Sequence, residues 1–357
     1  FAGEAFMRRF PITKRRLYET VLASLGAFHA DSSIDVRLHR SLHHVEILHR
    51  RALYADAAKV LSGVRKLAEE HDRQTILLQV AEWDRRLMER SNYTGVDRDA
   101  LEVRAQTVAD VHLQWQQVDD LWQVKSLCFL MIFRNGQSPN ETGMAQLSAL
   151  EAHPLLKENA PLRTAKARFL HYHVRSALAY ARNDLAECEK QLAANAELLR
   201  KEHLKFKDEQ DLLLGVMGNL AHVRMRLGKH REAVQGFREF KRVPLMMAVA
   251  PSADLDMKLF IMGSGLELSM LTVSGQFQAA LEQVTVLEKG MERFGGRIST
   301  VRRAELFLQA AYACFGAGRH DRALRWCNRT LNEKGLDAHI ELHALARGLN
   351  VAIHLET

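Results

Sequence analysis

The sequence contains few of the residues that interrupt helices. Among its 357 residues there are only 6 prolines and 20 glycines, and aromatic residues make up 7% of the chain. A protein built from short strands needs many tight turns and is usually rich in aromatic residues. The composition therefore argues against a sheet protein and favours long helices.

Long apolar runs are also missing. The most apolar stretch, Met257 to Val273, is interrupted by Lys258 and Glu267, which indicates a buried helix and not a membrane span. The chain begins at Phe1 with no apolar leader, so we expect a fragment without a secretion signal. No C-x-x-C pair occurs, which favours free buried thiols and a cytoplasmic location for the four cysteines, Cys128, Cys188, Cys314 and Cys327.

Catalytic motifs are absent as well. The sequence has no G-x-S-x-G elbow and no phosphate-binding loop, and Gly290, Gly295 and Gly296 match no dinucleotide fingerprint. Adjacent carboxylates such as Glu69 and Glu70 point apart on a helix, so a solvated face explains them. We therefore predict a protein that is not an enzyme and needs no cofactor.

What the sequence does contain is a repeat. A small residue recurs after a predicted turn, at intervals of 43, 45, 43, 45, 47 and 43 residues: Ala57, Ala100, Ala145, Cys188, Ala233, Ala280 and Ala323. A constant period of this size indicates stacked copies of one helical unit, each of which cannot bury its apolar face alone. We expect all seven residues to occupy the same close-packed position.

The turns share a local pattern. In the clearest units a glycine, Gly228, Gly275 or Gly318, precedes the small residue by five positions. Ala52 and Asn183 take the place of the glycine in two other units. Glycine permits the left-handed backbone of a helix C-cap, and a small residue lets the next helix approach closely. The pattern predicts helical hairpins.

These turns resemble those of the tetratricopeptide-repeat superfamily, over roughly residues 38–335. The resemblance implies a docking surface for proteins or peptides, although the family period is about 34 residues and this one is nearer 44. It also departs from chaperone-binding relatives, because the Lys/Asn carboxylate clamp is missing. The opening residues, Thr13 to Glu19 and Val45 to Leu48, are similar to a group of uncharacterised bacterial helical-repeat proteins.

We therefore predict an all-α, right-handed superhelical solenoid of about eight antiparallel helical hairpins, forming a single domain over residues 1–357. Residues 1–32 are expected to form an N-terminal helix and cap, with Thr13 capping the helix. Hairpin repeats follow over 33–335, where Ser33 caps a helix whose apolar stripe is Leu38, Leu42, Val45 and Leu48. Residues 336–357 form a C-terminal capping helix.

Histidines are numerous, with 17 in the chain. His39 and His43 lie four residues apart, and Glu46 extends their face, which is a spacing that a helical metal site needs. Neighbouring arginines would repel a divalent cation, and two good ligands are too few. His339 and His343 repeat the spacing without a matching glutamate. We predict no bound metal.

The net charge is +7, and the first 51 residues hold 9 Lys or Arg against 5 Asp or Glu. Acidic residues are mixed among the basic ones along most helices, so we do not expect nucleic acid to be the main partner. Nothing in the sequence predicts a membrane partner.

In the resembling superfamily, fixed positions of the first helix in each hairpin face the concave groove. Carried over to this sequence, those positions are His39, Glu46, His49, Arg50, Glu82, Arg85, Glu89, Arg134, His173, Tyr180, His222, Arg226 and Tyr312. The arginines would contact acidic groups of a partner, and Tyr180 and Tyr312 would act as aromatic anchors.

The predicted function is a non-enzymatic protein- or peptide-binding scaffold. The alternative is a regulatory or sensor arm of a larger protein, with its effector module upstream of Phe1.

Overall fold

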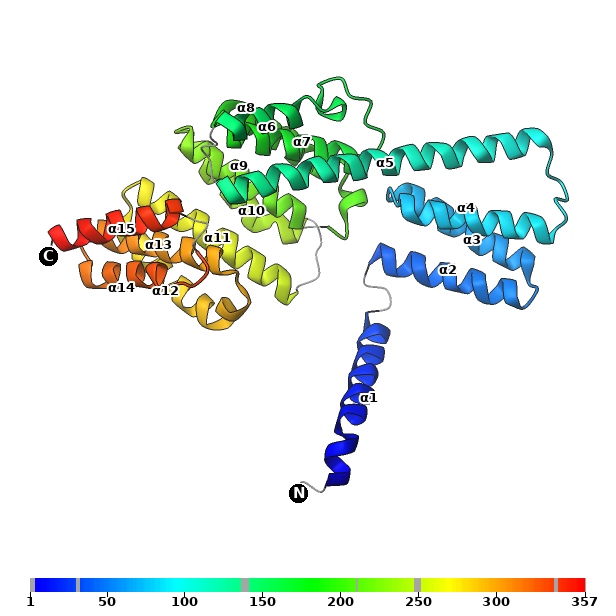
Figure 1. The fold of residues 1–357 in the computed structure, drawn as a ribbon, viewed down its shortest axis with the longest axis horizontal. Coiled ribbons are helices and arrows are strands. Elements are labelled where there is room, and N and C mark those ends of the chain that lie inside the picture. Colours follow the sequence, from blue (N-terminus) through cyan, green and yellow to red (C-terminus); the bar gives the residue numbers. More distant parts are fainter. Residues whose placement is uncertain are drawn as a thin grey trace. The chain divides into compact units, whose positions relative to one another are not determined.

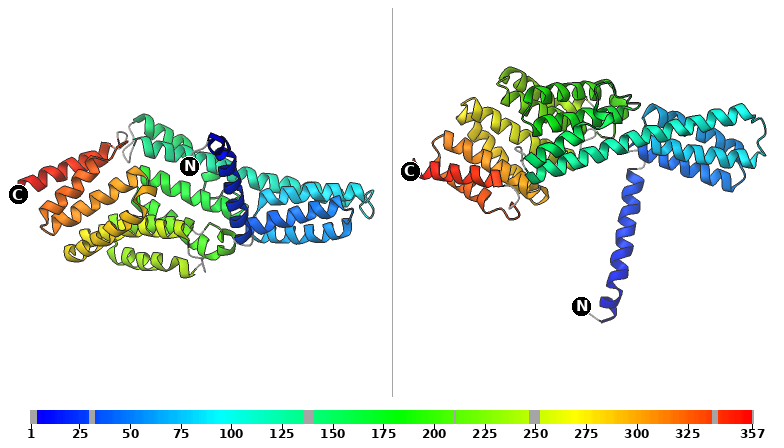
Figure 2. Two further views of the ribbon diagram at one scale, coloured as in Figure 1. Left: turned by 90° about the horizontal axis from the view of Figure 1, so that it is seen from below. Right: turned by 45° about the horizontal axis from the view of Figure 1, so that its top comes forward.

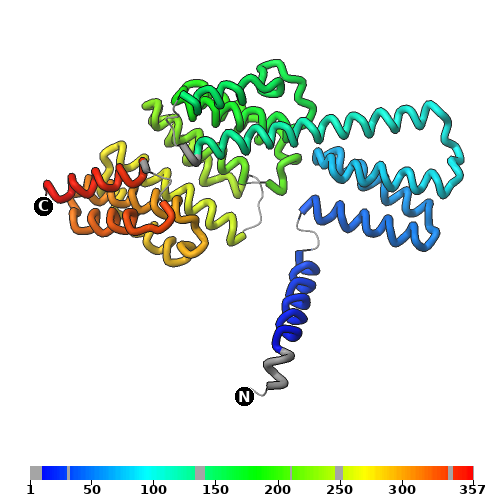
Figure 3. The backbone as a smooth tube through the Cα atoms, viewed as in Figure 1, coloured from blue at the N-terminus to red at the C-terminus, as the bar shows by residue number. Residues whose placement is uncertain are grey.

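The computed structural model describes residues 4–29, 33–135, 141–209, 211–246, 252–336 and 340–356. Side chains are described in these ranges except at 4–9, 133–135, 246 and 340. Figure 3 traces the chain from blue to red. The described residues form α-helices and short 3-10 turns without a strand, so the predicted all-α class is confirmed. Two compact units divide the chain, residues 1–115 and residues 116–357.

In the first unit, α2, α3 and α4 pack against one another. The ranges are α1 (Glu4–Phe28), α2 (Ile34–Arg50), α3 (Tyr54–Glu70), α4 (Gln74–Arg90) and the start of α5 (Arg98–Asn135) (Figure 1). α3 lies between α2 and α4, and contacts both. The predicted stripe on α2 is confirmed, since Leu38, Leu42 and Val45 are buried with residues of α3 and α4.

The first helix differs from its prediction in length. It begins at Glu4 and continues through Pro11, so the expected N-cap at Thr13 is wrong. Its described side chains, residues 10–28, are all exposed. Ser33, by contrast, caps α2 as expected, because its Oγ accepts a hydrogen bond from the backbone N–H of Val36 at 3.2 Å.

The second unit is a series of helical pairs. Its helices are the rest of α5, α6 (Glu141–Glu151), α7 (Ala165–Ala181), α8 (Leu185–Lys201), α9 (Asp211–Arg226), α10 (His230–Met246), α11 (Ala253–Val273), α12 (Phe277–Phe294), α13 (Thr300–Gly316), α14 (His320–Leu331) and α15 (Ile340–Leu355). Consecutive helices from α7 to α15 follow one another in space (Figure 2). α15 contacts α13 and α14, in agreement with the predicted C-terminal helix.

One turn recurs between the helices of five pairs. The residue at its centre has a positive φ: 58° at Ala52, 58° at Asn183, 74° at Gly228, 71° at Gly275 and 67° at Gly318. In each turn the residue after this centre donates its backbone N–H to the carbonyl five residues before it, as Arg319 does to Cys314 at 2.9 Å. The predicted left-handed C-cap is confirmed at all five positions.

The small residue five positions later is buried in each of these pairs. Ala57, Ala233, Ala280 and Ala323 are 0% exposed, and Cys188 is 2% exposed. A side chain no larger than that of cysteine lets the second helix of the pair come close to the first. The repeat therefore corresponds to five helical pairs with the same junction.

The two remaining repeat positions are wrong. Ala145 is exposed on α6, and Ala100 is half-exposed in the first turn of α5. Instead of a short hairpin, residues 98–135 form one continuous helix, in which no turn allows a second helix to fold back. On α6 the buried small residue is Gly143, two positions before Ala145. The spacing continues through residues 98–151, but the packing does not.

Among the described residues, no helix combines the length and the apolar character that crossing a membrane requires.

Candidate functional site

Alternate helices of the second unit form a continuous row. α9 contacts α11, α11 contacts α13, and α13 contacts α15. The helices between them, α10, α12 and α14, each pack against the row helix that precedes them. α7 adjoins this row at its C-terminal end, where the ring of Tyr180 lies 6.5 Å from that of His222 on α9. We call α7, α9, α11 and α13 the row helices. Most of the predicted binding residues of this unit lie on them.

A stack of three rings joins α5 to the first row helix. His173 on α7 lies between Phe129 of α5 and Phe169 of α7, with ring centroids 5.3 Å and 5.4 Å away and interplanar angles of 22° and 13°. Burial, with a smaller effect from the charge of Lys125, lowers the pKa of His173 to about 4. The imidazole is therefore neutral at pH 7 and packs as an aromatic ring.

Three predicted residues meet two turns further along α7. The rings of Tyr180 and His222 have centroids 6.5 Å apart, and the guanidinium carbon of Arg226 lies 5.7 Å from the Tyr180 ring. Arg226 also donates a hydrogen bond to Asn183 Oδ1 at 2.8 Å. His173 and Tyr180 are seven residues apart on one helix, so they share a face. We call Phe129, His173, Tyr180, His222 and Arg226 the aromatic face.

Charges of both signs act on this face. His222 keeps an exposed edge, yet burial by neighbouring atoms, followed by the charge of Arg226, lowers its pKa. From α13, Glu305 raises this pKa and Arg302 lowers it; the two side chains are themselves paired at 2.8 Å. Lys125 adds a further cation, whose pKa is lowered by burial and by Lys166. Cationic side chains outnumber carboxylates around the aromatic face.

The predicted residues of the first unit are engaged locally. Arg50 pairs with Glu46 at 2.6 Å on α2. On α4, Glu82 lies 2.9 Å from Arg86 and 3.9 Å from Arg85. Glu89 is exposed on the same helix. These exposed pairs within one helix contribute only about 0.3–0.5 kcal/mol each.

Three further residues need separate mention. Tyr312 is half-buried against the core around α13 and α14, where desolvation raises its pKa, and no described contact joins it to Tyr180. His49 packs edge-on against Tyr54 and Trp83, which indicates a structural role. Arg134 lies on α5, but its side chain is outside the described residues.

The sequence reasoning missed Phe129, Lys125, Arg302 and Glu305. Phe129 follows Trp115 and Trp122 at intervals of seven residues, which places the three rings along one edge of a helix. That spacing was the available signal. Treating residues 98–135 as part of a hairpin concealed it.

His39 and His43, whose spacing in the sequence resembles that of helical metal ligands, are both exposed on α2. His43 Nδ1 lies 3.6 Å from Glu46. Among the described residues, no three side chains of His, Cys, Asp or Glu gather closely enough to hold a metal ion. His339 lies outside the described residues.

All four cysteines are free and buried, as the sequence predicts. Burial raises the pKa of Cys128 and of Cys188 to about 12, and it also raises the pKa of Cys314 and Cys327. Since the thiolate is the reactive form, none of these thiols has the character of a nucleophile.

Neither a protein-family model nor a curated protein matches this chain. The candidate site therefore depends on its own geometry.

Proposed function

We propose that the chain is a non-enzymatic scaffold that binds a protein or peptide through the aromatic face of its second unit. The observation that carries the proposal is the meeting of Tyr180, His222 and Arg226 from two row helices, beside the stacked ring of His173. Tyrosine and arginine are the residue types that contribute most to binding energy in protein interfaces.

The chemistry of the face favours a partner with acidic and apolar groups. The neutral His173 ring and Phe129 offer an apolar contact, and Arg226, Arg302 and Lys125 offer cationic ones, against one carboxylate from Glu305. Guanidinium groups bind carboxylates with two parallel hydrogen bonds. We infer that the partner is an extended or helical segment that carries an acidic residue next to an aromatic or aliphatic one.

The proposed architecture is a right-handed solenoid similar to tetratricopeptide repeats. The five identical junctions, each with a small residue five positions after a left-handed turn, support it. Arrays of this kind bind segments by successive side chains of one helix row. Buried free thiols are consistent with a cytoplasmic location. An experimental structure with a left-handed superhelix would contradict the architecture.

The binding proposal is tested with a displayed peptide library. Peptides selected on the full chain are titrated by fluorescence anisotropy against Arg226→Glu and Tyr180→Ala. We expect each change to weaken binding at least about ten-fold, because each removes a central contact. The salt dependence should also decrease in Arg226→Glu.

The matched control is Arg231→Glu, an exposed arginine on α10, which is not one of the row helices. It should leave the affinity within about two-fold, as expected for a surface charge outside the interface. Unchanged binding by Arg226→Glu and Tyr180→Ala would refute the proposal. If only Arg231→Glu weakened binding, the partner would contact the helices between the row helices instead.

A further inference from the structure

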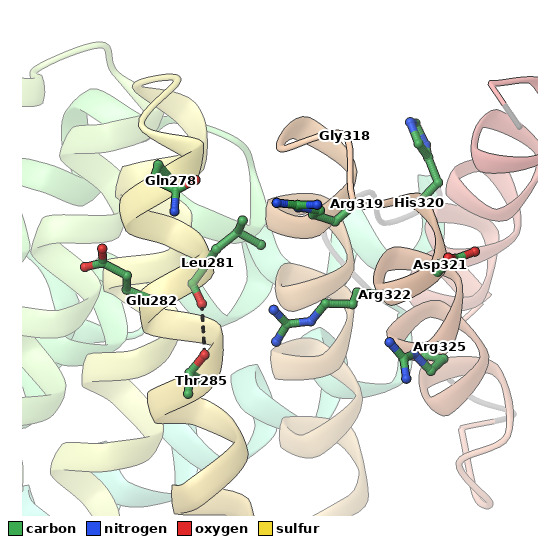
Figure 4. Close-up of a pocket in the computed structure, with 10 residues that line it drawn as sticks. All are labelled: Gln278, Leu281, Glu282, Thr285, Gly318, Arg319, His320, Asp321, Arg322 and Arg325. Carbon is green, nitrogen blue, oxygen red and sulfur yellow. Dashed lines mark hydrogen bonds between the residues drawn. The ribbon is translucent and has the colours of Figure 1, made fainter.

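An open pocket lies between α12 and α14, away from the aromatic face. Its volume is about 730 Å³, and residues 278–285 of α12 and 318–325 around the start of α14 line it (Figure 4). α13 contacts both of these helices. Among the lining side chains Leu281 is buried and apolar, whereas Gln278 and Thr285 are exposed and polar.

Three arginines dominate the pocket. Arg319 is the N-cap residue of α14, and Arg322 and Arg325 are neighbours one turn apart on the helix itself. In Figure 4 their guanidinium groups point toward α12. The two carboxylates of the lining, Glu282 and Asp321, point away from the space between the helices. The positive charge in the pocket is therefore concentrated where a ligand would lie.

Most of this charge is not neutralised within the described part of the chain. Arg322 lies 3.4 Å from Glu288, a long contact. Arg319 and Arg325 are exposed and have no carboxylate partner among the described residues. Elsewhere in the second unit, arginines at helix junctions are paired closely, as Arg303 is with Glu333 at 2.8 Å. Adjacent guanidinium groups repel one another unless an anion lies between them.

We propose that this pocket binds the phosphoryl groups of a small polyphosphorylated molecule. A tetrahedral phosphate presents oxygens to several donors at once, and the planar guanidinium fork binds such oxygens in pairs. A carboxylate has only two oxygens and would satisfy one arginine. The amide of Gln278 adds a donor on the opposite wall. Three arginines on successive turns suit a chain of linked phosphates better than a single one.

The lining also limits the rest of the ligand. Leu281 is the only large apolar side chain in it, and its only ring is that of His320. Figure 4 shows this imidazole pointing away from the space between the helices. A nucleobase would have no aromatic platform to stack on. The specificity of the pocket therefore lies in the phosphates and not in an attached base.

Isothermal titration of the full 357-residue chain with inorganic tripolyphosphate tests the proposal. We expect binding at one site, with an affinity that decreases as salt is added. In the double variant Arg319→Gln, Arg325→Gln, the dissociation constant should rise at least about ten-fold, because two charge-assisted contacts to the phosphates are lost. Both side chains are exposed, so the circular dichroism spectrum should not change.

Arg238→Gln on α10 is the matched control, because it removes an equally exposed arginine outside the pocket. It should change the dissociation constant by less than about two-fold. The proposal is overturned if tripolyphosphate binds the double variant as tightly as the native chain, or if citrate binds as well as tripolyphosphate. Arginine-dependent binding of a phosphoserine peptide or an oligonucleotide, without binding of tripolyphosphate, would also overturn it.

Discussion

The five helical pairs and the segment 98–151 have the same sequence period but different packing. In the pairs, a left-handed turn residue such as Gly318 precedes a fully buried small residue, Ala323, by five positions. The segment has Ala100 and Ala145 at the expected spacing, yet α5 continues as one helix and Ala145 is exposed. The sequence period alone therefore does not predict that two consecutive helices pack closely. A turn that reverses the chain between them is also needed.

Overpacking should give the largest difference in stability between the five helical pairs and the segment 98–151. Ala323→Leu places three more carbons at a position with 0% exposure, and we expect a loss of roughly 1–3 kcal/mol in the free energy of unfolding. Ala145→Leu, at an exposed position of α6, should change it by less than about 0.5 kcal/mol. Urea denaturation followed by circular dichroism measures both. Equal losses would remove the distinction.

The dependence of stability on pH should reveal an effect of intermediate size at the junction of α5 with α7. Burial and Lys125 lower the pKa of His173 to about 4, whereas a histidine in an unfolded chain titrates near about 6.5. Between these values the unfolded state binds more protons, so stability rises with pH. The stability that the neutral His173 gives the folded state is fully present above about pH 6.5 and is lost as the pH falls toward 4. From pH 7 to pH 5 we expect a loss of roughly 1–2 kcal/mol, reduced by partial exposure.

The variant His173→Phe isolates this contribution, since it keeps a ring between Phe129 and Phe169 and removes the titrating group. His171 and His222 have lowered pKa values as well and add to the slope in both proteins. The variant should therefore be less sensitive to acid than the native chain. The same denaturation series at pH 7, 6 and 5 gives the comparison, and identical slopes would mean that the stack does not hold His173 neutral.

The smallest effect compares two versions of the turn. Gly318 has a φ of 67°, so Gly318→Ala should cost about 1 kcal/mol. Ala52 occupies the same turn with a φ of 58°, and Ala52→Gly should stabilise the protein by about 0.5 kcal/mol. Thermal denaturation measures the two shifts. Shifts of the same sign would show that the turns are not equivalent.

The five helical pairs were predictable because a single residue type marks each turn, each close contact and each helix start. A glycine followed five residues later by alanine specifies both a turn and a close contact, and Ser33 specifies a helix start. The extension of α1 through Pro11 was not predictable in this way, because a proline at the eighth residue of a helix has no N–H to donate and is normally unfavourable there. The continuous α5 follows from the absence of a turn residue between residues 98 and 135.

The candidate site was partly predictable. Tyr180, His222 and Arg226 were among the positions predicted to face one groove, and the structure brings these three side chains together. Phe129 was missed because it comes from α5, which does not follow the repeat. The arginines at the start of α14 could not be identified either, since only the structure shows that Arg319 and Arg325 have no carboxylate partner among the described residues.

The four buried thiols have a practical consequence for measurement. With a pKa of about 12, the thiols of Cys128 and Cys188 are almost entirely protonated at neutral pH, and the thiolate that reacts with maleimide is nearly absent. A cysteine introduced at the exposed position of Ala145 or Gln278 should therefore react with maleimide much faster than the four buried cysteines. The chain is in effect ready for site-specific fluorescent or spin labelling without prior removal of its own cysteines.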